Sequence, residues 1–192
     1  MPNRAVDRGL ILLISVAILL TACGKRSQEE FLVPFNSVNT WGAKSVKIGE
    51  PLFAGLDIPR PKLRQPVHLL RVEMLGVPDG MVIDGVWAVR FSEYKGNYVG
   101  VTRGDEEAKR LRPHFHPVTD VILDPRCPPE ARCFPAPPGG GVSAQDWFLV
   151  AEYHMTKPGR FETAGFKVTA KVGGRTLSQS FEGKRIYAKS GP

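Results

Sequence analysis

The chain has 192 residues, of which 26 are Lys or Arg and 19 are Asp or Glu, giving a formal net charge of +7. This length suits a single domain with a substantial hydrophobic core. The excess positive charge is spread along the chain without a dense block of Lys and Arg, so we do not expect a nucleic-acid-binding protein.

The chain begins with a short charged segment followed by a mostly apolar run over residues 10–20. A helix needs about 20 apolar residues to cross the hydrocarbon core of a membrane, so this run is too short to span one. Its length is typical of the hydrophobic part of a secretory signal peptide, which precedes small residues at the cleavage site. The sequence therefore predicts an exported protein.

The run ends in Leu20-Thr21-Ala22-Cys23, which resembles the lipobox of bacterial lipoproteins. The resemblance is confined to this leader. It implies that residues 1–22 are removed and that the thiol of Cys23 carries a diacylglyceryl group, with further acylation such as palmitate. Two or more acyl chains anchor a protein stably, at about 0.8 kcal/mol per buried CH₂, whereas one does not. We expect an anchor on the extracytoplasmic side of a bacterial membrane, either the outer face of the cell membrane or the outer membrane.

With Cys23 assigned to lipid, the two other cysteines, Cys127 and Cys133, form a pair in an oxidising compartment. We predict a disulfide between them, in a Pro/Gly-rich loop at residues 125–141. Closing this short loop contributes about 2–2.5 kcal/mol in the chain-entropy model. Five residues separate the two cysteines, a spacing that does not favour zinc.

We divide the chain into a signal peptide at residues 1–22, a lipidated Cys and tether at residues 23–44, and a β domain at residues 45–190. From residue 45 the apolar residues recur with a period of two, as in strands. Strands are predicted at residues 45–48, 68–75, 83–91, 98–101, 118–123, 147–155, 166–172, 175–181 and 184–188. A single helix is predicted at residues 104–111.

The clearest local structure is a hairpin whose two-residue turn is Gly173-Gly174. In this register Phe166 faces Phe181, and Thr169 faces Ser178 on the other side. Many short strands separated by Gly and Pro turns predict an all-β fold, namely a single antiparallel β-sandwich. It resembles immunoglobulin-like and fibronectin-III-like domains in architecture only, and a small barrel is the alternative.

His114 and His116 lie between two prolines, where we expect an extended segment with both imidazoles on one side. Such a pair suits copper or zinc, with further ligands drawn from Asp120, His68 or His154. The competing interpretation is that both histidines are surface residues and that the residue between them packs inward. A copper- or zinc-binding lipoprotein is thus the alternative function.

We expect no enzyme, because the sequence lacks a Gly-x-Ser-x-Gly elbow, a phosphate-binding glycine loop and a Ser-x-x-Lys motif. The carboxylates of Glu73, Asp84 and Glu152 are explained by outward positions on strands.

In the Pro-rich loop, a weaker binding site is predicted at Arg126, Arg132 and Phe134. The sequence thus predicts a membrane-anchored, non-catalytic binding or structural module of the cell envelope without a cofactor. Its partners would be membrane lipid and an envelope protein or cell-wall polymer.

Overall fold

A computed structural model describes residues 30–33, 39–56, 61–62, 65–90, 92–94, 100–123 and 147–191. The signal peptide and most of the tether lie outside these ranges, and so do the predicted site residues Cys23, Cys127, Cys133, Arg126, Arg132 and Phe134. In the part of the chain that is described, no helix is long and apolar enough to cross a membrane.

Strands dominate the described chain, which confirms the all-β prediction. The strands are β1 (Asn39–Val46), β2 (Leu52–Leu56), β3 (Val67–Leu75), β4 (Met81–Arg90), β5 (Val101–Arg103), β6 (Ile122–Leu123), β7 (Trp147–Met155), β8 (Arg160–Glu162), β9 (Gly165–Val172), β10 (Arg175–Glu182) and β11 (Lys184–Ser190). The helix α2 (Asp105–Leu111) lies where a helix is predicted, and it is followed by the 3₁₀ turns η1 (Arg112–His114) and η2 (Val118–Asp120).

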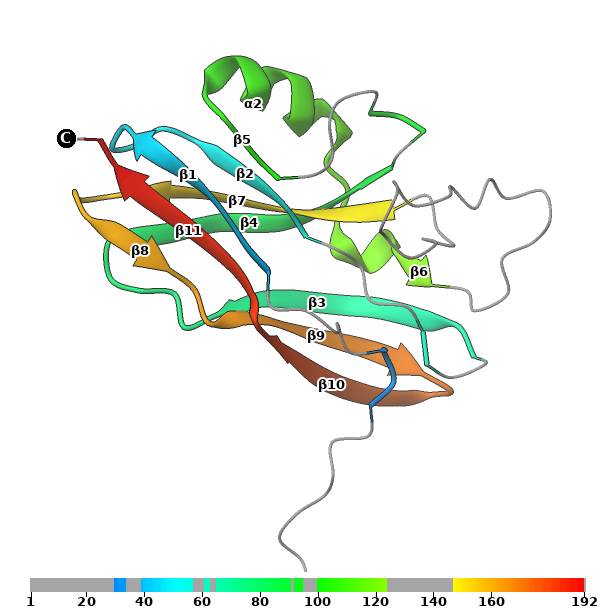
Figure 1. Ribbon diagram of the computed structural model, residues 1–192. Coiled ribbons are helices and arrows are strands. Elements are labelled where there is room, and N and C mark those ends of the chain that lie inside the picture. The colour runs from blue at the N-terminus through cyan, green and yellow to red at the C-terminus, as the bar shows by residue number, and fades with distance from the viewer. Residues whose placement is uncertain are drawn as a thin grey trace, which may run out of the picture.

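The strands form three sheets around a common core (Figure 1). The helix-side sheet has the order β4-β7-β2-β5, and α2 lies above it in the figure. The hairpin sheet has the order β10-β9-β3-β6, and the front sheet has the order β1-β11-β8. This sandwich-like arrangement agrees with the predicted fold class.

Gly183, with φ 96°, separates β10 from β11. The bend there takes the chain from the hairpin sheet into the front sheet, because β10 pairs with β9 whereas β11 pairs with β1 and β8. The sequence predicts a purely antiparallel sandwich. This prediction is wrong for the front sheet, because β1 pairs with β11 in parallel. A parallel pair needs a long crossover, and here everything between β1 and β11 forms it.

The hairpin of β9 and β10 has the predicted register: Phe166 pairs with Phe181, and Thr169 with Ser178. The two Phe rings stack with centroids 5.1 Å apart inside the main core. On the other face, the hydroxyl oxygens of Thr169 and Ser178 are 2.9 Å apart and share a hydrogen bond. Alternation and turn type together fix such a register.

Phe31 and Leu32 are fully buried, although they belong to the predicted tether. The side-chain oxygen of Gln179 on β10 accepts hydrogen bonds from both backbone N–H groups, at 3.1 and 3.0 Å, and its amide donates to the carbonyl of Leu32 at 3.0 Å. Lys62 donates its backbone N–H to the carbonyl of Phe31 at 2.8 Å. We call this arrangement the N-terminal clamp.

Three predicted strands differ from the structure, and β2 and β8 are not among the predicted strands. The strand predicted at residues 98–101 shares only Val101 with β5, which continues to Arg103. The strand predicted at residues 45–48 is the end of the longer β1, which begins at Asn39, and Ile48 lies in the following turn. The segment predicted as a strand at residues 118–123 starts as the 3₁₀ turn η2, and only its last two residues form β6. Val121 still accepts a hydrogen bond from Leu69 of β3, so the turn stays attached to the hairpin sheet.

Candidate functional site

The helix α2 covers only part of the outward face of the helix-side sheet. Its Ala108 and Leu111 pack with Phe53, Phe148 and Val150 of the sheet in a second, smaller core. A seven-residue helix is about 10 Å long, whereas the nine residues of β7 extend about 30 Å. The helix therefore leaves the remainder of the outward face of this sheet uncovered.

A cavity of about 650 Å³ lies on the uncovered part, and we call it the polar cavity. Alternation along β7 directs Ala151, Tyr153 and Met155 into the main core, so Glu152 and His154 face the cavity. The described residues that line it come from the β1–β2 turn, β4, α2, the segment after α2, and β7: Gly49, Pro51, Asp84, Trp87, Asp105, Arg112, Phe115, Glu152 and His154.

Asp84 and His154 form one polar pair in the cavity. The pairing of β4 with β7 shifts register between Ile83 and Gly85, and this irregularity places Asp84 beside His154. Nδ1 of His154 lies 2.8 Å from Oδ2 of Asp84. Because an ionised carboxylate only accepts hydrogen bonds, Nδ1 donates, and Nε2 of a neutral ring remains an acceptor.

Glu152 and Arg112 form the second pair. The side chain of Glu152 is only 8% exposed, and both Nε and Nη2 of Arg112 donate to its Oε1, at 2.9 and 2.7 Å. These charged hydrogen bonds offset the cost of burying the carboxylate. Since both go to one oxygen, Oε2 has no hydrogen bond to a described residue and can accept one from a ligand.

Trp87 and Phe115 form the apolar wall of the cavity. Their rings stack with centroids 5.4 Å apart and planes at 12°. The indole of Trp87 lies over Gly85, where an added Cβ would be 2.7 Å from Nε1. Nε1 is buried and has no hydrogen-bond partner among the described residues. An unpaired buried donor costs about 1–3 kcal/mol. Because Nε1 is covered by Gly85, the cavity is offered the face of the indole and not its N–H.

Negative charge predominates in the polar cavity. The carboxylates of Asp84, Asp105 and Glu152 line it together with the guanidinium of Arg112 and the imidazole of His154. With a neutral imidazole, carboxylates exceed cations by two among the described lining residues. Clustered charges of one sign raise the local concentration of ligands of the opposite sign.

The paired Asp and His resemble part of a catalytic triad, but the described lining contains no Ser, Thr or Cys to act as nucleophile. His154 can accept a hydrogen bond, the carboxylates can hold donors, and Arg112 can hold an acceptor. This set of groups favours the binding of a polar ligand.

The predicted pair of histidines makes protein contacts. His114 ends the 3₁₀ turn η1 instead of an extended segment, and its ring packs edge-on against Tyr94, with centroids 6.0 Å apart. Nε2 of His116 donates to Oε2 of Glu93 at 2.8 Å, and its ring packs edge-on against Trp147, with centroids 5.4 Å apart. The hydrogen bond from His116 is the main reason why the pKa of Glu93 lies below its ordinary value.

The further metal ligands that the sequence suggests are distributed over three places. Asp120 has a carboxylate oxygen 4.0 Å from Nδ1 of His116, His154 lies in the polar cavity, and His68 lies on β3 in the hairpin sheet. In the described part of the chain, no group of three or more His, Cys, Asp or Glu side chains is arranged to hold a metal ion.

Sequence reasoning assigned Asp84 and Glu152 to outward strand positions without a site. Both do face outward from the helix-side sheet, but Arg112 and Phe115 lie against that face and turn it into a cavity wall. Glu73, by contrast, forms a surface ion pair with Arg71 on β3, at 2.9 Å. One signal was present in the sequence: Glu152 directly follows the continuously apolar residues 147–151, and a carboxylate buried among such residues needs a partner.

Comparisons with protein-family models, curated proteins and solved structures find no match to this chain. The described geometry defines a class, an all-β sandwich domain with a polar cavity on the outer face of one sheet.

Proposed function

We propose that this chain is a lipid-anchored, extracytoplasmic, non-catalytic binding protein, and that its polar cavity holds a ligand with an ammonium group. The observation that carries the proposal is that the described lining of the cavity holds three carboxylates and a single guanidinium. No described residue donates a hydrogen bond to Oε2 of Glu152. The buried carboxylate can therefore accept a hydrogen bond from an ammonium N–H of the ligand.

The other groups in the cavity favour a ligand that also carries an acceptor oxygen. Arg112 keeps N–H donors beyond the two that bond to Glu152. A compound with an ammonium group and a hydroxyl or carbonyl oxygen satisfies both sets. Amino sugars and the amino ends of peptides have this chemistry.

The anchor part of the proposal rests on the leader and agrees with the N-terminal clamp. Seven peptide steps join Cys23 to Glu30, where the described chain begins. They span at most about 25 Å, which would hold the domain close to its membrane. Confinement of this kind raises the effective concentration toward partners in the envelope, whether proteins or cell-wall polymers.

Metabolic labelling with a palmitate analogue tests the anchor. The wild-type protein and a Cys127→Ser/Cys133→Ser control should be labelled and recovered with membranes, whereas Cys23→Ser should lose both properties. Labelling of the Cys23→Ser variant would refute lipidation at this residue.

Thermal unfolding with matched amines tests the cavity. Glucosamine and putrescine should raise the Tm, and the acetylated controls N-acetylglucosamine and N,N′-diacetylputrescine should not, because acetylation removes the charge. Glu152→Gln should lose the response, whereas Glu73→Gln, on the surface of β3, should keep it. Equal shifts with the acetylated compounds, or a full response in Glu152→Gln, would contradict the proposal.

A further inference from the structure

The front sheet carries a second charged surface, made by residues other than those that line the polar cavity. Along β11 the buried residues are Lys184, Ile186 and Ala188, and the residues between them face outward. Arg185 and Lys189 are exposed, and half-buried Tyr187 lies between them. Alternation thus puts two cations and one aromatic ring in a row on the outer face.

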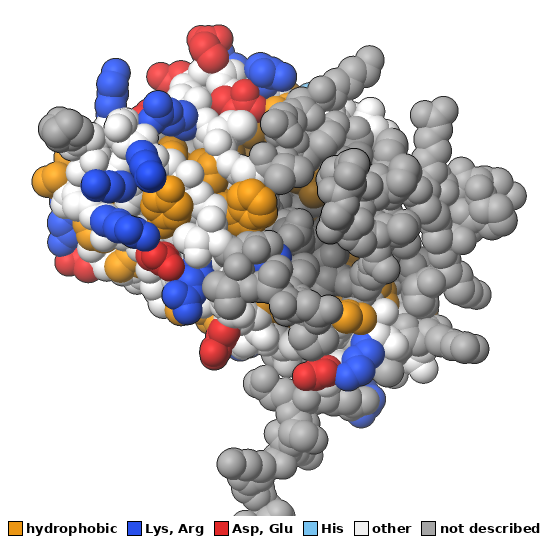
Figure 2. Space-filling model, in the orientation of Figure 1, with side chains coloured by type: hydrophobic (Ala, Val, Ile, Leu, Met, Phe, Trp, Pro, Cys, Tyr) orange, Lys and Arg blue, Asp and Glu red, His pale blue; other side chains and the backbone are white. Residues whose placement is uncertain are grey.

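The neighbouring strands extend this row. Arg160 of β8 pairs with Lys189, and Lys44 of β1 is exposed. Glu162 is the only acidic residue in β1, β8 and β11, and it lies 3.5 Å from Arg160 and 3.4 Å from Arg185. One carboxylate therefore faces four cations, and Figure 2 shows Lys and Arg side chains gathered over this region. We call the outward residues of the three strands the basic face.

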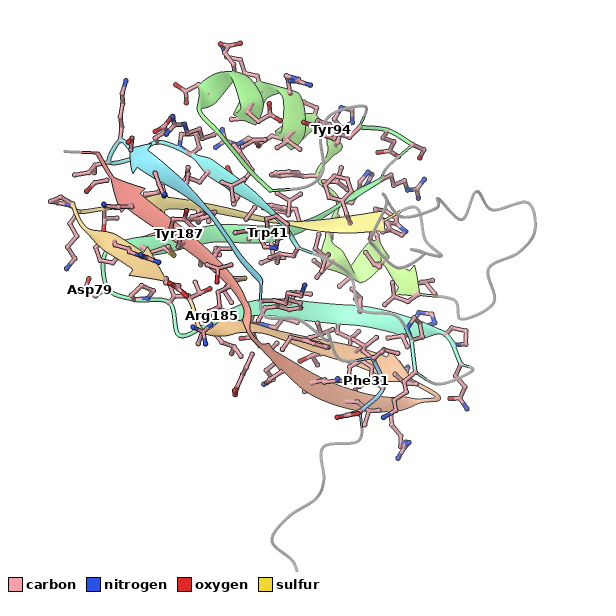
Figure 3. The ribbon with its side chains drawn as sticks, in the orientation of Figure 1. Phe31, Trp41, Asp79, Tyr94, Arg185 and Tyr187 are labelled. Atoms are coloured by element: carbon pink, nitrogen blue, oxygen red, sulfur yellow. The ribbon has the colours of Figure 1, made fainter. Side chains whose placement is uncertain are left out.

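Gly42 lets an aromatic ring lie close against the basic face. This residue pairs with Tyr187, and an added Cβ would lie 2.1 Å from Cδ1 of the ring, so the ring lies directly on the β1 backbone. The guanidinium of Arg160 lies over the ring, 5.4 Å from its centroid. Figure 3 shows Tyr187, Trp41 and Arg185 along this sheet.

Arg103 of β5 fixes the neighbouring edge of the basic face. Its Nη1 donates to the backbone carbonyls of Lys44 and Ser45, at 2.9 and 3.1 Å. Ser45 has a φ of 56° at the irregularity of β1, and these bonds hold its strained backbone in place. The position of Lys44 is therefore set by the fold.

We propose that the basic face binds an acidic polysaccharide, a flexible glycan that carries carboxylate or phosphate groups along its length. The cations are exposed along the outward side of three adjacent strands, which matches an extended polyanion. They also lie away from the N-terminal clamp, because β11 runs from the bend at Gly183 in the direction away from residues 30–33 (Figure 1). This position favours a polymer over the headgroups of the membrane that would hold the anchor.

The binding of polygalacturonate to the full-length protein in detergent tests this proposal. Wild type should bind, more weakly as salt rises, and neutral dextran should not bind. The charge reversal Arg185→Glu/Lys189→Glu should weaken binding about 30-fold. The control Lys109→Glu/Lys171→Glu makes the same change in net charge on α2 and β9. Its affinity for polygalacturonate should stay within about twofold of the wild-type affinity.

Equal weakening by the two double variants would show attraction to net charge alone and would overturn the proposal. It would also fail if the protein bound phosphatidylglycerol vesicles but not polygalacturonate, since a lipid surface would then be the occupant. Thermal unfolding confirms that each variant is folded. The amine response of the polar cavity should persist in Arg185→Glu/Lys189→Glu, so the outcomes at the two surfaces are separable.

Discussion

Gly165 and Gly174 both adopt positive φ angles, 146° and 82°, but their surroundings differ. At Gly165 an added Cβ would lie 2.2 Å from the carbonyl oxygen of Phe181, whereas nothing lies within 4 Å at Gly174. The first residue is required for close backbone approach at the start of β9, and the second only for turn geometry. Substitutions at these two glycines therefore distinguish the cost of steric overlap from the cost of a strained backbone conformation.

We expect Gly174→Ala to lower the free energy of unfolding by about 1 kcal/mol, the typical cost of a strained residue. Gly165→Ala should cost about 3 kcal/mol or more, because the overlap with backbone adds to that strain. Urea unfolding of both variants measures the difference. Equal losses would mean that the β9–β10 pair can move apart at little cost.

The ion pair between Arg112 and Glu152 lends itself to a double-mutant cycle. Arg112→Ala leaves a buried carboxylate without its donors, which should lower stability by about 1–3 kcal/mol. Glu152→Gln removes the charge of the carboxylate. The loss of unfolding free energy in the double variant should therefore be smaller than the sum of the losses in the two single variants, by about 0.5–3 kcal/mol. Additive losses in urea unfolding would show that the two side chains do not interact in solution.

The contact of His116 with Glu93 predicts a pH dependence. The pKa of Glu93 is lowered in the folded protein, chiefly by the hydrogen bond from His116, so the ionised form is favoured by folding. This contribution is present above the ordinary pKa of a glutamate, about 4.3, and is lost as the pH falls through the lowered value. Glu93→Gln should therefore be less stable than wild type at about pH 5.5, and this difference should shrink as the pH falls below the ordinary pKa of a glutamate. A stability difference that did not change as the pH fell would contradict this assignment.

At the scale of elements, the N-terminal clamp ties a segment from the start of the chain to the hairpin sheet. Gln179 uses both ends of its amide for this purpose, and its side chain is buried with Phe31 and Leu32. A buried amide satisfied by three backbone bonds specifies the position of the segment as well as stabilising it. The segment then behaves as part of the domain.

Replacing Gln179 with Leu keeps the volume but removes all three hydrogen bonds, leaving buried backbone groups unpaired. We expect a loss of about 2–4 kcal/mol and faster proteolysis near residues 31–32. Ser180→Ala, the neighbouring exposed position on β10, serves as the control. If Gln179→Leu were cleaved no faster than wild type, the clamp would owe its position to apolar packing alone.

Sequence periodicity predicted the hairpin of β9 and β10 with its register, because alternation and a Gly-Gly turn are local signals. It also predicted α2 and the strand at β7. It did not predict the polar cavity, because Asp84 and Glu152 are far apart in sequence and are joined only by the β4–β7 pairing. The role of Arg112 was equally hidden, since it depends on how the turn after α2 folds back over the sheet.

The placement of the clamp predicts how the whole molecule is oriented. Figure 3 labels Phe31 at the lower end of the molecule, and α2 lies at the upper end. A domain held by the proposed anchor through the clamp should thus present the hairpin sheet toward the membrane and α2 away from it.

Energy transfer to a lipid dye measures this orientation. Residue 62 belongs to the N-terminal clamp, and residue 109 lies on α2. A fluorophore at residue 62 should transfer energy to the lipid dye more efficiently than a fluorophore at residue 109. Equal efficiencies would indicate free tumbling on the tether. In Cys23→Ser, neither position should transfer.

The parallel pairing of β1 with β11 has a consequence for biogenesis. Register partners such as Asn39 and Lys184 are separated by nearly the whole domain. If the chain is exported as proposed, the front sheet cannot close until β11 has reached the same side of the membrane as β1. Contacts of such high sequence separation form late and slowly. A chain exported as proposed would therefore stay unfolded enough to pass through a translocation channel, and β1 would pair with β11 only after export.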